Sequence, residues 1–144
     1  MRKLTGGVVA LLVMCASLTW GSDKKIVRPA GAAPSKNWSH GILVGDTLYV
    51  SGMGGEDKDG KVPASFEAET KLALENIGAV LKEAGMTPAD VVAVQVYLTD
   101  GATFDRMNAV YTAFFPEPRP TRTTVVVAKL VGPGHIEITA TARK

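Results

Sequence analysis

Two charged side chains near the end of the chain have the types and spacing to act on a small acid. Arg122 follows Pro118 and Pro120, which restrict the backbone and define how the arginine enters an apolar segment. A guanidinium is always charged and presents paired donors, so it can bind a carboxylate at two points. Glu137 comes later, and a partly buried carboxylate can orient water or act as its general base. Pattern alone favours a plainer alternative, a surface ion pair.

Two predicted strands must position these residues. Val125–Val127 is β-branched and uninterrupted, which is typical of a strand covered on both faces. After a turn signal at Gly132-Pro133-Gly134, the segment 136–141 alternates apolar and polar residues. This alternation predicts that Glu137 lies on the more polar face of its strand. We expect the arginine and the glutamate at the ends of neighbouring strands.

The preceding segments predict the rest of the domain. A β-hairpin is expected with its turn at Gly45-Asp46. Ser65 is a good N-cap for a helix with an apolar stripe, and Gly85 ends that helix. A strand over 91–98 and a second helix capped by Thr103 follow. This order predicts an α+β fold in which a mixed β-sheet carries two helices on one face. The other face keeps apolar surface, which favours self-association with sites between subunits.

The first segment of the 144-residue chain has the composition of a secretory signal peptide. It begins with positive charge, is mostly apolar over Val8–Met14, and offers small residues near Gly21. The apolar run is too short for a membrane span. We expect residues 1–21 to be removed on export to the periplasm or beyond. Residues 22–36 then form an extended arm and 37–144 one domain.

Removal of this segment changes the charge and the cysteine count. The chain has 16 basic and 14 acidic residues, and the loss of Arg2 and Lys3 leaves 14 of each. A neutral domain lacks the electrostatic signature of nucleic-acid binding. Cys15 is the only cysteine, so no thiol nucleophile remains. With two histidines and no spaced cluster, neither a metal site nor a metal cofactor is expected.

Other residues can line a ligand site. Gly52 belongs to a glycine-rich stretch after the hairpin, which allows close approach of a ligand, although loosened loop backbone is the commoner explanation. Trp38 can wall a pocket or simply pack against the hairpin. Thr124 can supply a hydroxyl or merely favour a strand. Asn108 has an amide that needs partners if it is buried, and a solvent-facing amide is as compatible.

Several motifs together resemble the reactive intermediate deaminase family, the RidA/YjgF-type enamine and imine deaminases. The resemblance covers about residues 35–142. The matching pieces, in order, are Val44-Gly45-Asp46, Tyr49-Val50-Ser51-Gly52, Leu74-Glu75-Asn76-Ile77, Leu81-Lys82-Glu83-Ala84-Gly85, Val96-Tyr97-Leu98-Thr99-Asp100, Phe104-Asp105, Met107-Asn108-Ala109-Val110-Tyr111, Phe114-Phe115, Pro120-Thr121-Arg122-Thr123, Val127-Ala128-Lys129-Leu130 and Ile136-Glu137-Ile138.

The resemblance implies a chorismate-mutase-like fold and a homotrimer with clefts at the subunit interfaces. Family members hydrolyse enamines and 2-imino acids to 2-keto acids and ammonia without a cofactor. The arginine that binds the substrate carboxylate falls on Arg122, and the glutamate that positions water falls on Glu137. Ser51, Gly52 and Asn108 fall on cleft-lining positions.

The chain departs from the family pattern around the same cleft. Trp38 stands where a tyrosine is usual, Met53 replaces a glutamine, Thr124 a cysteine and Thr139 an acidic residue. The sequence therefore predicts an exported, cofactor-independent deaminase of the 2-iminobutanoate/2-iminopropanoate type. The alternative is a non-catalytic trimer that binds small carboxylates.

Overall fold

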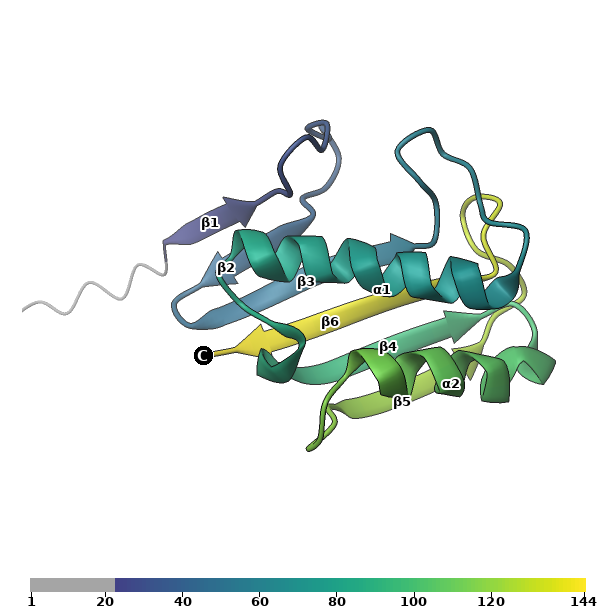
Figure 1. Cartoon of the computed structure of the whole chain (residues 1–144). Coiled ribbons are helices and arrows are strands. Elements are labelled where there is room, and N and C mark those ends of the chain that lie inside the picture. Colours follow the sequence, from purple (N-terminus) through teal and green to yellow (C-terminus); the bar gives the residue numbers. More distant parts are fainter. Residues whose placement is uncertain (1–22) are drawn as a thin grey trace, which may run out of the picture.

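The computed structural model describes residues 23–144, and the predicted signal peptide lies outside them. Six strands form one mixed sheet in the order β1-β2-β3-β6-β4-β5 (Figure 1). Neighbouring strands are antiparallel except for the parallel pair β4 and β5. The strands are β1 (Lys24–Val27), β2 (Gly41–Val44), β3 (Thr47–Gly54), β4 (Val91–Leu98), β5 (Thr121–Val126) and β6 (Ile136–Arg143).

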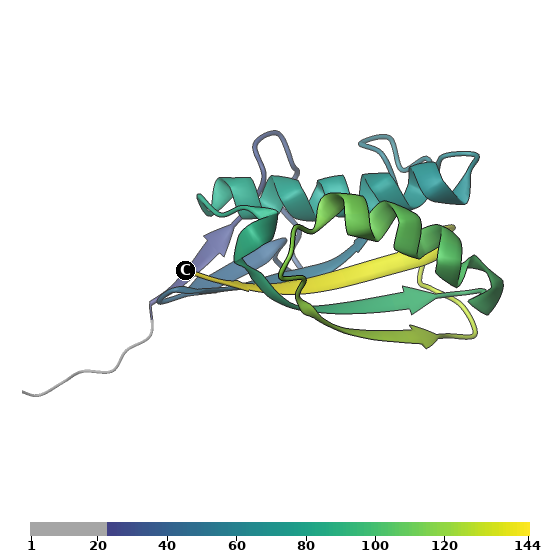
Figure 2. The ribbon, with the colours of Figure 1, turned by 60° about the horizontal axis from the view of Figure 1, so that its bottom comes forward.

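Two helices, α1 (Phe66–Glu83) and α2 (Phe104–Phe114), cover one face of this sheet (Figures 1 and 2). Short 3₁₀ turns, η1 (Pro88–Asp90) and η2 (Gly101–Thr103), precede β4 and α2. Because β4 and β5 are parallel, the chain must cross over between them, and α2 makes this connection. The predicted α+β architecture, a mixed sheet with two helices on one face, is confirmed.

The ends of α1 follow the sequence signals, whereas the start of α2 does not. The Ser65 Oγ accepts a hydrogen bond from the Ala68 N–H at 3.2 Å, and Gly85 follows the helix with a φ of 67°. Thr103 makes no capping bond to α2, because its hydroxyl donates to the Asp100 carbonyl oxygen at 2.6 Å. The Asp100 carboxylate instead caps the preceding turn through the Ala102 N–H.

The core lies between the helices and the sheet. It receives Leu74, Ile77 and Leu81 from α1 and alternate residues from the strands, such as Ile136 and Ile138 of β6. Glu137 lies between these two on β6, is only partly buried and faces the other side of the sheet, so its predicted position on the more polar face is confirmed.

The segment 22–36, expected to be an extended arm, contains β1, which pairs with β2 at the edge of the sheet. One expectation about a strand is wrong for the single chain. Val125–Val127 was expected to be covered on both faces, but β5 is an edge strand and Val126 is 60% exposed. A run of β-branched residues indicates a strand, but burial depends on what lies beside it.

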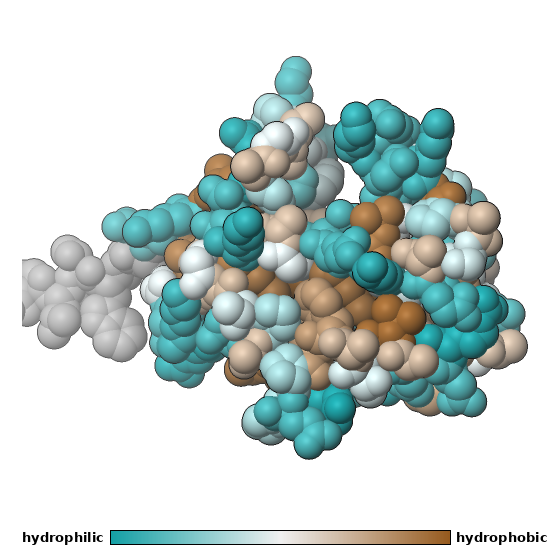
Figure 3. Space-filling model, in the orientation of Figure 1, coloured by the Kyte–Doolittle hydropathy of each residue, from teal (hydrophilic) through white to brown (hydrophobic). Residues whose placement is uncertain are grey.

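The face of the sheet opposite the helices is uncovered (Figure 2). Tyr49 is exposed there, and together with Ala93, Gln95, Thr139 and Thr141 it surrounds a shallow depression. On the helix-covered face, apolar side chains form a central patch bordered by hydrophilic ones (Figure 3). Within residues 23–144, no helix combines the length and the apolar character that crossing a membrane requires.

Candidate functional site

Arg122 lies on the helix-covered side of β5. It is paired with Val94 of β4, a core residue, and paired side chains on neighbouring strands point to the same face. Its guanidinium carbon lies 4.6 Å from the centre of the Tyr111 ring and 5.6 Å from that of Phe104. Its Nη1 is 3.9 Å from the sulfur of Met107. All three contacting residues belong to α2, which therefore holds Arg122 at the edge of the sheet.

Among the five arginines within residues 23–144, Arg122 alone combines partial burial with the lack of a carboxylate partner. Arg106 pairs with Glu67, and Arg119 and Arg143 pair with other acidic residues. Arg28 is exposed to solvent. Arg122 alone among the five is partly buried, and its recorded partners are aromatic rings and a thioether. Its charge is therefore available to an anion from outside the described chain.

Two further predicted residues lie on the same side of the sheet as Arg122. Thr124 is paired with the core residue Val96, and its buried Oγ1 has no hydrogen-bond partner within the described chain. Asn108 is partly buried on α2, next to Met107. The Tyr111 hydroxyl is also buried without a partner. Burial raises the pKa of Tyr111, against the opposing effects of the Arg122 and Arg119 charges.

A second group of predicted residues surrounds Glu137 on β6. Glu137 is paired with Tyr97 of β4 and with Gly54 of β3. The register of β3 shifts between Val50 and Met53, so Gly52 lies in an irregular segment beside Glu137. A Cβ atom at Gly52 would be only 2.7 Å from the Glu137 Cδ. Glycine at this position thus leaves the space that the Glu137 carboxylate occupies.

Ser51 links this irregular segment to residues 38–40, which precede β2 and include Trp38. Its hydroxyl donates to the Ser39 carbonyl oxygen at 2.6 Å, and its N–H donates to the carbonyl oxygen of His40. The Trp38 and His40 rings lie 4.6 Å apart. Burial lowers the pKa of His40, and the charge of Arg28 lowers it further. Ser51 therefore fixes the backbone at Ser39 and His40, directly after Trp38.

Trp38 and Gly52 line the same open pocket, which has a volume of about 690 Å³ and is also lined by Met53, His40 and Asn76. Trp38 remains 49% exposed, so its ring is a wall of this pocket and does not belong to the core. A side chain of a bound molecule beside Gly52 can extend into this space. Among residues 23–144, no group of three or more potential ligands is arranged to hold a metal ion.

Arg122 and Glu137 lie on opposite faces of the sheet. Arg122 is in register with Val94 of β4, whereas Glu137 is in register with Tyr97, three residues further along the same strand. Side chains alternate along a strand, so an odd separation places them on opposite faces. Strand β4 also separates β5 from β6. The expectation that Arg122 and Glu137 lie on neighbouring strands is therefore wrong, because β6 inserts between β3 and β4.

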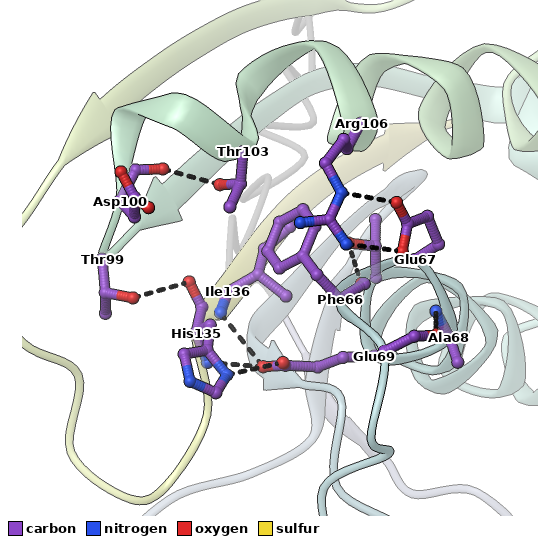
Figure 4. A network of polar contacts seen from close by, with 12 residues as sticks. Phe66, Glu67, Ala68, Glu69, Thr99, Asp100, Thr103, Arg106, His135 and Ile136 are labelled. Atoms are coloured by element: carbon purple, nitrogen blue, oxygen red, sulfur yellow. Dashed lines mark hydrogen bonds and ion pairs between the residues drawn. The ribbon is translucent and has the colours of Figure 1, made fainter.

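A buried network anchors the start of β6 just before Glu137 (Figure 4). The Glu69 carboxylate, on α1, is 1% exposed and accepts hydrogen bonds from the N–H groups of His135 and Ile136. It also lies 2.8 Å from the His135 Nδ1. The sequence presents Glu69 only as an acidic residue in the first turns of a helix. Its contact with a segment more than sixty residues later had no local signal.

The chain is similar to known proteins in both sequence and structure. A family model described as Endoribonuclease L-PSP matches residues 28–144. The chain belongs to this family. It is the RidA/YjgF family that the motifs resemble, and its fold is the expected chorismate-mutase-like one. The family match thus begins within the segment that was expected to be an arm.

Relatives of this RidA/YjgF chain include proteins named for imine chemistry. A RutC family protein from Saccharolobus solfataricus is 42% identical over 113 residues, which are 77% of this chain and 90% of that one. A 2-iminobutanoate/2-iminopropanoate deaminase from Bos taurus is 40% identical over 116 residues, 79% and 82% of the two chains. The crystal structure of E. coli TdcF with bound serine matches this chain with a TM-score of 0.75 and 32% sequence identity. The match covers 84% of this chain and 99% of the TdcF chain.

Proposed function

We propose that this chain is an exported enamine/imine deaminase that hydrolyses small 2-imino acids to 2-keto acids and ammonia. The observation that carries the proposal is Arg122, a partly buried guanidinium without a carboxylate partner in residues 23–144. Partial burial of an unpaired charge is unfavourable, so we expect a ligand to supply the anion. The names of two relatives support this ligand class, one by its 2-imino acid deaminase activity and one by its bound serine.

The proposed reaction needs only the groups that this site can offer. Arg122 binds the substrate carboxylate through paired N–H donors. In the protonated imine, the C=N electron pair moves to nitrogen as a water oxygen bonds to the carbon, and Glu137 takes the proton that this water loses. Glu137 then protonates the amino group and the C–N bond breaks. The hydroxyl electrons form the carbonyl of the keto acid, ammonia leaves, and the hydroxyl proton passes to solvent.

We propose that the site is shared between subunits of a homotrimer. Arg122 and Glu137 lie on opposite faces of one sheet, so a site that uses both is most simply built from two copies. One copy then contributes Arg122 with Asn108 and Thr124, and its neighbour contributes Glu137 with the Trp38 pocket. The exposed face around Tyr49 and the exposed edge at β5 offer apolar surface for such an assembly.

The catalytic assignment is tested with 2-iminopropanoate, generated in situ by an amino-acid oxidase, and by calorimetric binding of 2-oxobutanoate. Loss of a desolvated charge contact costs about 2–5 kcal/mol, so Arg122→Ala is expected to bind 2-oxobutanoate at least about 30-fold more weakly and to lose turnover. Glu137→Gln should bind it and fail to turn over. Full activity of Arg122→Ala in a folded protein contradicts the proposal. Binding without turnover by the unmodified protein indicates a carboxylate-binding protein instead.

The shared site is tested by mixing the same two variants. In trimers assembled at random from equal amounts of Arg122→Ala and Glu137→Gln, an intact Arg122 meets an intact Glu137 at about one interface in four. About a quarter of the activity of the unmodified trimer should therefore return after unfolding and joint refolding. If a single chain supplies both groups, the mixture stays as inactive as its components.

The proposal that the protein is exported rests on the composition of residues 1–21, which resembles that of a signal peptide. We expect the protein from a periplasmic fraction to begin near residue 22, as measured by N-terminal sequencing. Leu12→Arg, which interrupts the apolar run, should retain the full-length chain in the cytoplasm. Recovery of the full-length unmodified chain from the cytoplasm alone contradicts export.

A further inference from the structure

We propose that Tyr111, Phe104 and Met107 are positioning residues that hold the Arg122 guanidinium in place for a carboxylate without neutralising its charge. This inference rests on the proposed function, and it concerns residues outside the candidate catalytic pair. Positions 104, 107 and 111 recur at helical spacing, so they lie on one face of α2. On sequence alone, this spacing indicates an apolar stripe that packs into the core.

The contacts of Arg122 show that the stripe has a second role. The guanidinium carbon lies 4.6 Å from the centre of the Tyr111 ring and 5.6 Å from that of Phe104, both within the range of cation–π attraction. The sulfur of Met107, 3.9 Å from Nη1, is a weak acceptor. These three groups attract a cation, but none carries a negative charge. They can therefore restrict a flexible side chain and leave its strong donors unpaired.

Arg106 provides a contrast within the same chain. Its guanidinium carbon lies 5.5 Å from the centre of the Phe66 ring, at a similar range to that of Arg122 and Phe104. However, the Glu67 carboxylate accepts hydrogen bonds from Nε and Nη2 of Arg106 at 2.5 and 2.8 Å. A substrate carboxylate at Arg106 would have to displace this partner. At Arg122 the ring contacts are present and no carboxylate competes.

Burial distinguishes the contributions of the two rings. Tyr111 is 2% exposed and its hydroxyl has no partner within the described chain, an unfavourable state for a buried polar group. A phenylalanine would keep the ring and remove the unpaired hydroxyl. Phe104 is 40% exposed, so its replacement should perturb the core little. Phe104→Leu is therefore the sharper probe, and Tyr111→Phe against Tyr111→Leu separates ring from hydroxyl.

The first measurement is the affinity for 2-oxobutanoate by calorimetry. A cation–π contact and the ordering of one long side chain each correspond to a few-fold to tens-fold in affinity, so Phe104→Leu should weaken binding by about 3- to 30-fold. Tyr111→Phe should bind more tightly than Tyr111→Leu. Phe66→Leu removes the ring at a similar distance from Arg106 and should bind like the unmodified protein, because Arg106 has its own carboxylate. Phe66 belongs to the core, so a melting curve first establishes that this control variant is folded.

The second measurement separates positioning from general stability. Nitrogen-15 relaxation of the Arg122 Nε, without ligand, should show a rigid guanidinium in the unmodified protein and a more mobile one in Phe104→Leu. An equally rigid Arg122 with unchanged affinity in both Phe104→Leu and Tyr111→Leu overturns the inference while leaving deaminase activity intact. An unmodified protein that neither binds 2-oxobutanoate nor hydrolyses the imine overturns the proposed function, and this inference with it.

Discussion

Substitution of Gly52 by alanine should disable Glu137 while the protein stays folded. The added Cβ would lie 2.7 Å from the Glu137 Cδ and 3.1 Å from its Cγ. Carbon atoms in contact prefer about 3.5–4.0 Å, so the carboxylate has to move by roughly 1 Å. Gly52 does not have a positive φ, so its backbone accommodates alanine without strain. The cost falls on the position of the carboxylate rather than on the fold.

The size of the effect follows from the precision that proton transfer requires. A misplacement of about 1 Å in a reacting group can reduce a rate by about 100-fold. We therefore expect kcat for 2-iminopropanoate to fall by about that factor in Gly52→Ala. Affinity for 2-oxobutanoate should change less, because Arg122 and its surroundings lie on the other face of the sheet. The melting temperature should stay within a few degrees of that of the unmodified protein.

Gly54→Ala is the matched control two residues along β3. Its added Cβ would lie 2.9 Å from the Cδ of Glu56, so it also displaces the end of a glutamate side chain, but not the one proposed to act in catalysis. This variant should keep its turnover. If Gly52→Ala retains the full kcat, Glu137 does not act from the position seen here. If both variants lose activity equally, the effect belongs to the strand and the assignment of Glu137 loses this support.

Three further predictions concern stability. Glu69→Ala leaves the part-buried N–H of His135 and the buried N–H of Ile136 without their acceptor and should lower the free energy of unfolding by about 2–5 kcal/mol in urea titrations. Glu69→Gln keeps one acceptor oxygen and should lose less, and equal losses would contradict the role of that oxygen. Hydrogen bonds from Arg106 lower the pKa of Glu67 to about 2, so its contribution is fully present above its ordinary pKa of 4.5 and is lost as the pH falls toward 2. The melting temperature of Glu67→Gln should therefore change less with pH across this acid range than that of the unmodified protein. An equal change with pH in both proteins would show that the pair has no effect on stability. Burial, aided by the Arg28 charge, lowers the pKa of His40 below 6.5, so protonation opposes folding and stability falls as the pH drops below 6.5. His40→Gln should remove that part of the decrease, and a curve identical to that of the unmodified protein would refute it.

Much of the fold could be predicted because its signals are local. Ser65 and Gly85 mark the ends of α1 through backbone geometry that involves only a few neighbouring residues. Gly45-Asp46 marks the β2–β3 turn for the same reason. Thr103 failed as a cap because Asp100 begins a 3₁₀ turn just before α2. Two capping residues so close together offer alternatives that residue type alone does not separate.

The candidate site was only partly accessible from the sequence. Arg122 and Glu137 could be chosen by side-chain chemistry and by resemblance to a family, and the chain does belong to that family. Their relation in space could not, because strand order places β4 between β5 and β6, and the register of these strands on β4 puts the two residues on opposite faces. The buried Glu69 network was missed for a related reason, since its partners lie far along the chain.

The sequence by itself determined which groups are available: a guanidinium after two prolines, a carboxylate on the polar face of a strand, and a glycine-rich stretch after a hairpin. It also determined the helices and strands, because periodicity and caps act over a few residues. Only the tertiary structure decided which side chains meet. Strand order and register are set by contacts between distant segments, and a shift of one residue moves a side chain to the other face. That is why the rings of α2 come to surround Arg122, and why Gly52 makes room for Glu137.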